Sequence, residues 1–198
     1  MSRRGTNPAV VFGFFGFGVV VLLAAAGGGS PVQGASTVGG ILRSKLGQFF
    51  TLAELVRSTA AERLGLDNTP PPAAQANLER LVAKVLDPLR THLGRPVRIT
   101  SGFRSAAVNK ALDGSPTSQH MLGEAVDIKA DGLTAVELAT VILRLGVPVD
   151  QVIWYDPERG GHVHVSYTET RANRRESLHA PVGGGYVPWK PAASPRVA

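Results

Sequence analysis

The sequence contains no cysteine among its 198 residues. This absence excludes disulfide bonds, zinc sites with thiolate ligands, iron–sulfur clusters and a cysteine nucleophile. Aromatic residues are also scarce, at 6%, whereas apolar residues make up 43% and charged residues 18%. That balance is typical of a globular chain and is too apolar for disorder throughout. The length predicts one ordinary domain with additional segments at its ends.

Acidic residues are absent from the first 45 residues, which contribute +4 to the formal net charge of +6. Residues 168–198 contribute a further +3, so the stretch between these flanks sums to −1. A domain that binds nucleic acid normally carries a basic stripe on its folded part. The near-neutral centre therefore argues against a nucleic-acid partner, and the pI of about 10.2 comes from the two flanks.

The longest uncharged apolar run, residues 9–26, follows Arg3 and Arg4 and is eighteen residues long. A helix that spans a bilayer needs ~20 such residues, so the run predicts an anchor in the cytoplasmic membrane. The small residues at positions 24–26 equally suit the cleavage site of a signal peptide, and this alternative stays open. In both cases the segment 1–26 would direct the rest of the chain to the periplasmic or extracellular side.

Composition divides the remaining chain into three parts. Glycine- and serine-rich residues 27–48 predict a flexible linker. Residues 49–170 carry the periodic apolar patterns of a folded domain. Residues 171–198 are basic and rich in glycine and proline, and we expect an irregular tail there.

Within the domain, the capping boxes Thr51–Glu54 and Thr134–Glu137 predict helices at about residues 52–64 and 135–145. Apolar residues spaced by three and four predict a further helix through residues 77–93, kinked at Pro88. Short β-prone runs lie at residues 97–100, 125–128, 151–155 and 162–167, and the turn residues 156–161 join the last two as a hairpin. Helices followed by a small sheet with one interposed helix predict an α+β domain.

Two segments concentrate residues that can bind a metal ion. His120 lies in a turn-like stretch, and Asp127 lies in an apolar run where a buried carboxylate needs a cation or hydrogen-bond donors. His162 and His164 are two residues apart on the last strand and therefore share one of its faces. Two imidazoles and a carboxylate are a ligand set of catalytic zinc sites. From the residues alone, polar histidines on a half-solvated strand are an equally good interpretation.

These segments resemble a known family when they are taken together. Ser-x-His-x-x-Gly-x-Ala-x-Asp at residues 118–127, followed by His-x-His at residues 162–164, resembles the zinc D-Ala-D-Ala carboxypeptidases and L-Ala-D-Glu endopeptidases that act on bacterial peptidoglycan. Ser-Gly-Phe-Arg at residues 101–104 resembles the family's Ser-Gly-Tyr-Arg segment. Residues 49–66 resemble the phage-type branch found in endolysins and virion-associated lysis proteins. The implied fold is Hedgehog/DD-peptidase-like, with helices packed on a small, mainly antiparallel sheet that carries the zinc site.

The resemblance implies a role for each matching residue. His120, Asp127 and His164 would be the ligands of a Zn²⁺ ion. Arg104 would bind a substrate carboxylate or the developing oxyanion, a role that suits a planar, permanently charged guanidinium. Ser118 would support the ligand loop by a hydrogen bond and lie near the substrate.

The general base is less clearly indicated. Some members of the family carry an acidic residue three positions before the last ligand, where this sequence has Gly161. His162 shares a face with His164 and is our first choice for the base. Asp156 and Glu158, in the preceding loop, are the alternatives.

The sequence thus predicts a zinc peptidase that cleaves stem or cross-link peptides of peptidoglycan during lysis, entry or wall remodelling. It would be held by residues 9–26 on the cytoplasmic membrane or a virion membrane. The missing acid at Gly161 supports an alternative, a catalytically inactive peptidoglycan-binding or virion structural module with the same fold. A membrane-anchored signalling protein is a third interpretation, supported only by the apolar run and the basic tail.

Overall fold

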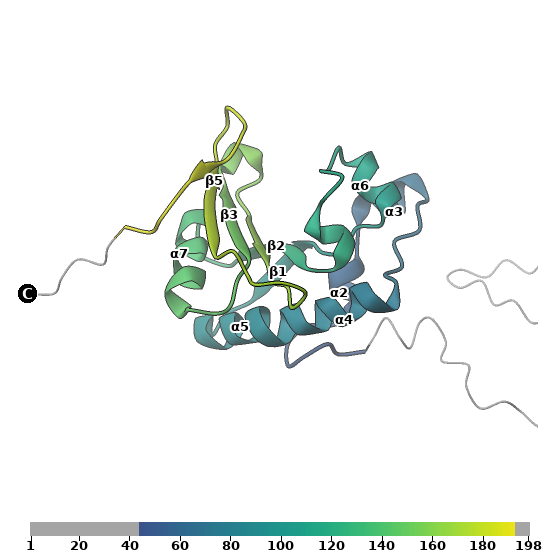
Figure 1. Ribbon diagram of the computed structural model, residues 1–198, viewed down its shortest axis with the longest axis horizontal. Coiled ribbons are helices and arrows are strands. Elements are labelled where there is room, and N and C mark those ends of the chain that lie inside the picture. Colours follow the sequence, from purple (N-terminus) through teal and green to yellow (C-terminus); the bar gives the residue numbers. More distant parts are fainter. Residues whose placement is uncertain (1–43, 193–198) are drawn as a thin grey trace, which may run out of the picture. The chain divides into compact units, whose positions relative to one another are not determined.

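The computed structural model describes residues 44–192, so the predicted anchor or signal and most of the predicted linker lie outside the described part. A six-stranded sheet has the strand order β1-β2-β4-β3-β5-β6 (Figure 1). Its strands are β1 (Val97–Ser101), β2 (Ala125–Ala130), β3 (Gln151–Tyr155), β4 (Val163–Ser166), β5 (Glu176–Ala180) and β6 (Val187–Pro188). Every neighbouring pair is antiparallel except β3 and β5. The predicted α+β class and mainly antiparallel sheet are confirmed.

Helices and short helical turns flank this sheet (Figure 1). They are α2 (Leu52–Val56), α3 (Thr59–Leu64), α4 (Pro72–Leu81), the π-helical turn η1 (Val82–Leu86), α5 (Asp87–Leu93), α6 (Ala106–Ala111), α7 (Ala135–Leu145) and the 3-10 turns η2 (Gln119–Leu122) and η3 (Pro157–Arg159). The apolar side of α4–α5, including Leu78 and Leu89, packs into the same cluster as Val126 and Val165 of the sheet. None of the helices within residues 44–192 has the length and apolar character needed to cross a membrane.

Both capping boxes form as predicted, but the first opens a shorter helix than we expected. The predicted helix at residues 52–64 is interrupted at Arg57, whose backbone is extended. The Leu55 carbonyl accepts from Phe103 N at 2.7 Å instead of continuing the helical ladder. Ser58 then caps α3 by accepting from Ala61 N at 3.2 Å. A hydrogen bond to a distant segment and a local cap therefore divide one predicted helix into two.

The predicted kink at Pro88 takes the form of a change in helical type. Proline has no backbone N–H, so it removes one bond from the α-helical ladder. The turn η1 precedes it, and its last bond runs from Asp87 N to Val82 O, five residues back. The wider turn accommodates the proline while α4, η1 and α5 follow each other without a loop.

Two short strands, β5 and β6, lie within residues 171–198, where we expected an irregular tail. Strand β5 lies parallel to β3, with Gln151 opposite Glu176, and buries Leu178 against Ile153. The residue that holds the start of β5 from elsewhere in the chain is Asp150, which is fully buried. The end of the predicted linker also contacts the domain. Gln48 N donates to Asp87 Oδ2 at 2.7 Å.

Asp150 fixes the segment that leads into β5. Its carboxylate accepts from Arg171 Nη2 at 2.9 Å and from Arg174 Nη2 at 2.7 Å. Its carbonyl accepts from Glu176 N at 3.0 Å. Burial by itself raises the pKa of Asp150, but the hydrogen bonds from the two arginines outweigh it and hold the pKa well below 3.8.

We expect Asp150→Asn to lower the free energy of unfolding at pH 7 by roughly 2–4 kcal/mol, because the amide loses its charge-assisted bonds. A group whose folded-state pKa is lowered contributes fully above its unfolded pKa of about 3.9, and the contribution is lost as pH falls. The difference between variant and wild type should therefore shrink below about pH 4. Urea unfolding at pH 7 and at pH 3 measures both effects.

The matched control is Asp131→Asn, which removes an ion pair with Arg98 whose side chains are both at least half exposed. Exposed pairs contribute about 0–1 kcal/mol, so this variant should unfold almost like the wild type. Equal stability of the two variants at pH 7 would contradict the role assigned to Asp150.

Candidate metal centre

The three predicted ligands converge from two adjacent strands and one turn. Asp127 of β2 and His164 of β4 lie directly opposite each other in the antiparallel register. The pleat turns their neighbours Val163 and Val165 into the core, so the polar pair faces the opposite side of the sheet. His120 comes from η2, the turn that immediately precedes β2. All three side chains are buried.

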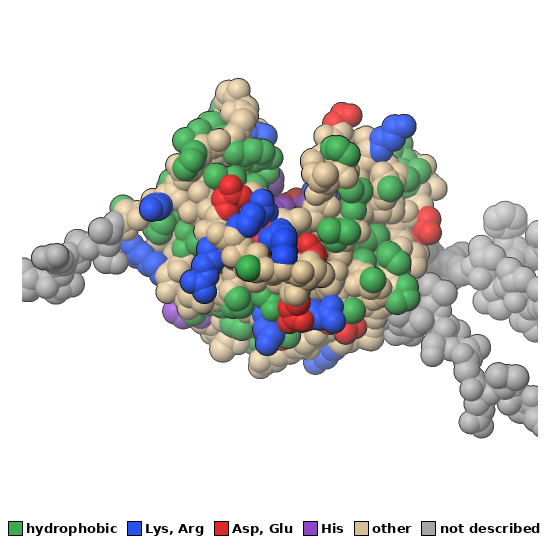
Figure 2. All heavy atoms as spheres, viewed as in Figure 1, with side chains coloured by type: hydrophobic (Ala, Val, Ile, Leu, Met, Phe, Trp, Pro, Cys, Tyr) green, Lys and Arg blue, Asp and Glu red, His purple; other side chains and the backbone are tan. Residues whose placement is uncertain are grey.

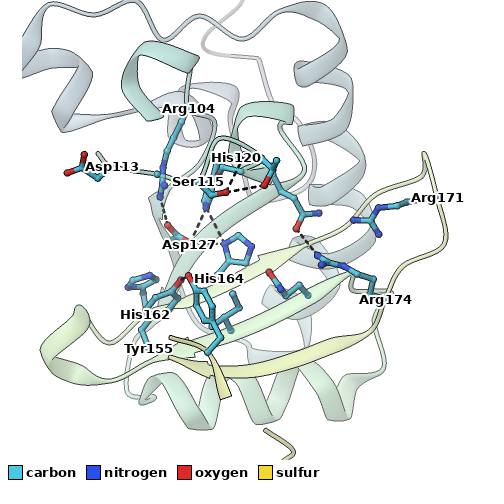
Figure 3. A pocket seen from close by; sticks show the side chains of 17 residues that line it. Arg104, Asp113, Ser115, His120, Asp127, Tyr155, His162, His164, Arg171 and Arg174 are labelled. Carbon is cyan, nitrogen blue, oxygen red and sulfur yellow. Dashed lines mark hydrogen bonds and ion pairs between the residues drawn. The ribbon is translucent and has the colours of Figure 1, made fainter. Parts of the chain in front are cut away.

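The ligand atoms form a compact triangle (Figure 3). His164 Nδ1 lies 3.1 Å from Asp127 Oδ1, and His120 Nε2 lies 3.2 Å from that oxygen and 3.2 Å from His164 Nδ1. Ligand atoms at ~2.0–2.1 Å from a tetrahedral zinc lie roughly 3.3–3.4 Å apart. The triangle is therefore close in size to one face of a zinc coordination shell.

The hydrogen bond on the far side of His120 leaves the three facing atoms suited to a cation. His120 Nδ1 lies 2.8 Å from Gly102 O, which only accepts, so the neutral ring carries its proton on Nδ1. His120 Nε2 then presents a lone pair toward the lone pairs of Asp127 Oδ1. A single proton on His164 Nδ1 cannot be donated to both His120 Nε2 and Asp127 Oδ1. A metal ion would accept from all three, and the residues present fit it.

The second oxygen of Asp127 is held by an arginine. Arg104 Nη2 donates to Asp127 Oδ2 at 2.7 Å, and its Nε donates to Ser101 Oγ at 2.9 Å. The carboxylate is therefore oriented with Oδ1 toward the histidines. Such outer contacts fix ligand geometry in metal sites.

The protonation states also suit metal binding. Burial by itself raises the pKa of Asp127, but its interactions with His120 and His164 prevail and lower the pKa well below 3.8. Burial lowers the pKa of His164 from 6.5, with Asp127 acting in the opposite direction. Near neutral pH the carboxylate is ionised and the His164 ring is neutral, which is the state in which both groups coordinate metal.

The triangle opens into a cleft with a volume of about 570 Å³. Figure 2 shows the cleft as a hollow between the part that carries β3 and β5 and the part that carries α6. Its lining residues are Arg104, Asp113, Gly114, Ser115, Thr117, Ser118, Gln119, His120, Asp127, Gln151, Ile153, Tyr155, His162, His164, Arg171, Arg174 and Tyr186. A ligand can therefore approach the triangle from solvent, as a catalytic site requires and a closed structural site does not.

His162, our first choice for the general base, also lines the cleft. Its ring stacks on Tyr155 with a centroid distance of 4.2 Å and an angle of 17°. Burial lowers the pKa of His162 from 6.5, with Asp127 opposing the shift, so the ring is neutral near pH 7 and can accept a proton.

The alternatives for the base lie elsewhere. Asp156 accepts from His179 Nε2 at 2.7 Å and from Val182 N at 2.9 Å, and it does not line the cleft. Glu158 is exposed in η3 and makes no hydrogen bond or ion pair with any described residue. Ser118 is half-buried in the cleft wall, but its hydroxyl makes no hydrogen bond among residues 44–192. The expected Ser118 bond within the ligand loop is therefore not seen.

Among the cleft residues that sequence reasoning missed are two tyrosines and two arginines, Tyr155, Tyr186, Arg171 and Arg174. Tyr155 and Tyr186 place their hydroxyl oxygens 3.3 Å apart. The sequence shows that arginines are frequent after residue 170, but it does not show that they reach the cleft. Their place there depends on the pairing of β5 with β3.

We expect the full-length protein to bind one zinc ion and each of His120→Ala, Asp127→Ala and His164→Ala to lose it, because two ligands do not hold the ion tightly. Zinc should raise the melting temperature of the wild type and leave that of the three variants unchanged. Elemental analysis after dialysis measures the bound metal. The exposed His92→Ala is the control and should keep it. Stoichiometric zinc in one of the three variants would remove that residue from the ligand set.

Comparison with known proteins agrees with this geometry. The family model described as Peptidase M15 matches residues 48–166, which is 119 of the 198 residues. The match includes the three candidate ligands, Arg104 and His162 and ends with β4. None of the curated proteins that were compared matches the sequence. Because the family model covers more than half of the chain, and because the fold carries a buried His-Asp-His triangle at the floor of a cleft, the chain belongs to the peptidase M15 family.

Proposed function

We propose that the protein is a zinc metallopeptidase that hydrolyses stem or cross-link peptides of bacterial peptidoglycan. The observation that carries the proposal is the triangle of His120, Asp127 and His164, buried at its base and open to the cleft, with His162 beside it. Family membership supports a metallopeptidase. The substrate class is supported by the resemblance of the two motifs to peptidoglycan peptidases.

Zinc at these three ligands would supply Lewis acidity, polarising a peptide carbonyl and making water a better nucleophile near neutral pH. His162 would accept a proton from the attacking water and deliver it to the leaving amine as the C–N bond breaks. The products are a carboxylate and an amine. The stacked Tyr155 ring holds the imidazole of His162 in one orientation.

Arg104 has a donor left for the substrate. Its Nη2 and Nε are bonded to Asp127 and Ser101, and its Nη1 makes no hydrogen bond within residues 44–192. The side chain is 17% exposed and lines the cleft. Its Nη1 is therefore suited to a substrate carboxylate or to the oxyanion that forms at the scissile carbonyl.

Two bonds, D-Ala-D-Ala and L-Ala-D-Glu, are the candidate targets. We further propose that the enzyme acts outside the cytoplasm, either held by residues 9–26 on a cell or virion membrane or released by cleavage after them. This placement would bring the cleft to its substrate, because peptidoglycan lies on that side of the cytoplasmic membrane.

Full-length protein incubated with purified peptidoglycan should release fragments with new amine ends, and mass spectrometry of these fragments names the bond. A chelator should abolish release, and added zinc should restore it, because the reaction depends on the metal. Asp127→Ala serves as the inactive control. Binding to peptidoglycan without any release by the zinc-loaded protein would instead favour the inactive module.

His162→Ala should keep its zinc but lose about 10²- to 10⁴-fold in kcat, the usual contribution of a general acid–base group. His162 lies outside the ligand triangle, so metal content separates this effect from the loss of a ligand. Glu158→Gln is the matched control and should retain wild-type kcat, since Glu158 is exposed away from the cleft. Loss of activity in Glu158→Gln with normal activity in His162→Ala would reverse the assignment.

A further inference from the structure

The segment between β4 and β5 adds two arginines to the cleft. Arg171 and Arg174 both line it, and both lie beyond the residues that the family model matches. Their side chains are 44% and 47% exposed, although each is bonded to the buried Asp150. Each guanidinium is therefore fixed on one side and open to solvent on the other.

The cluster of Arg171, Arg174, Asp150 and Glu176 is neutral overall, but of these four residues only the two arginines line the cleft. Two guanidinium groups share one carboxylate of Asp150, which has no exposed surface. Glu176 lies 3.4 Å from Arg174 Nη1 and also accepts from Gln151, so Arg174 is the more completely paired arginine. Arg171 keeps its Nε without a hydrogen bond among the described residues. A fixed, partly unpaired guanidinium in a cleft is suited to a carboxylate.

The arginine pair lies on the other side of the metal triangle from Arg104. Figure 3 shows Arg104 and His162 on one side of Asp127 and His164, and Arg171 and Arg174 on the other. Gln119 links the pair to the metal turn, because its side chain bonds Asp150 at 3.1 Å and Arg174 at 3.4 Å and it directly precedes His120. The connection that carries the two arginines leads from β4 to β5, and these strands are two strand spacings apart, roughly 10 Å. An extended peptide covers that distance in about three residues.

We propose that Arg171, supported by Arg174, forms a carboxylate-binding subsite for the substrate peptide, across the metal centre from Arg104. The proposal rests on the proposed function. Substrates that bear a free carboxylate within about three residues of the scissile bond bind there. Asp150 holds the two guanidinium groups in place before the substrate arrives, so that little side-chain entropy is lost on binding.

Binding of the peptide L-Ala-γ-D-Glu-L-Lys-D-Ala-D-Ala to the full-length protein tests the proposal. Three forms are compared: the free acid, the α-amide of the D-Glu residue, and the C-terminal amide. Calorimetry with a chelator present gives affinities without turnover. One of the amides should bind the wild type about 10- to 100-fold more weakly than the free acid, the usual effect of losing a charge-assisted hydrogen bond.

The Arg171→Gln variant should bind the free acid and the amide that binds the wild type more weakly with equal affinity. Arg175→Gln, an equal change of charge at an exposed neighbour outside the cleft, should keep the wild-type difference. Arg171→Lys keeps the charge and should show an intermediate difference, which serves if Arg171→Gln is unstable. Wild-type binding without any effect of amidation, or full discrimination in Arg171→Gln, would overturn the proposal. Intact discrimination without hydrolysis by the zinc-loaded wild type would refute the peptidase and leave the subsite standing.

Discussion

The cross-strand pair of Asp127 and His164 determines the position of nearly everything else in the site. Both residues occupy the centre of the sheet, where their strands also supply Val126 and Val165 to the core. A one-residue slip of this register would turn the polar pair into the core and the valines into the cleft. The hydrophobic core therefore enforces the register that the metal centre needs, and the stability of the fold and the geometry of the site depend on the same strand pairing.

The third ligand is placed by close backbone contacts. Gly102 supplies the carbonyl that orients His120, and a Cβ at that position would lie 2.0 Å from Leu55 O. Gly123 ends the metal turn with a φ of +70°, and a Cβ there would lie 2.2 Å from Ala74 O. Only glycine fits at both positions. Helix α2 thus packs closely on the backbone at Gly102, and α4 packs closely on the end of the turn that carries His120, so packing explains both motif glycines.

Local signals in the sequence predicted the elements whose geometry is decided locally. The capping boxes at Thr51 and Thr134 and the hairpin turn at residues 156–161 form as expected, because their hydrogen bonds join residues close in sequence. The break after α2 was missed, since it depends on Leu55 O bonding Phe103 N across the fold. The parallel pairing of β5 with β3 was missed for the same kind of reason.

The site was predicted to a similar extent. His120, Asp127 and His164 could be named from their motifs, because the spacing and residue types of a metal site are visible in a sequence. The sequence did not decide whether His162, Asp156 or Glu158 reaches the cleft. Asp156 is an alternative to His162 in the sequence, yet in the structure it is bonded to His179 on β5, a contact between distant segments that no local pattern encodes.

Topology explains why the basic flank reaches the cleft. Strand β4 ends at Ser166, opposite Gln151, and β5 begins at Glu176, opposite the same residue. The connection at residues 167–175 therefore leaves and rejoins the sheet at the same position along the strands. This position is two residues beyond His164 on β4. Asp150 lies at that position, since its backbone bonds both ends of the connection. Asp150 bonds Arg171 and Arg174 of this connection, and Gln119 of the metal turn bonds Asp150 and Arg174. The parallel placement of β5, rather than any motif, therefore brings these two arginines into the cleft.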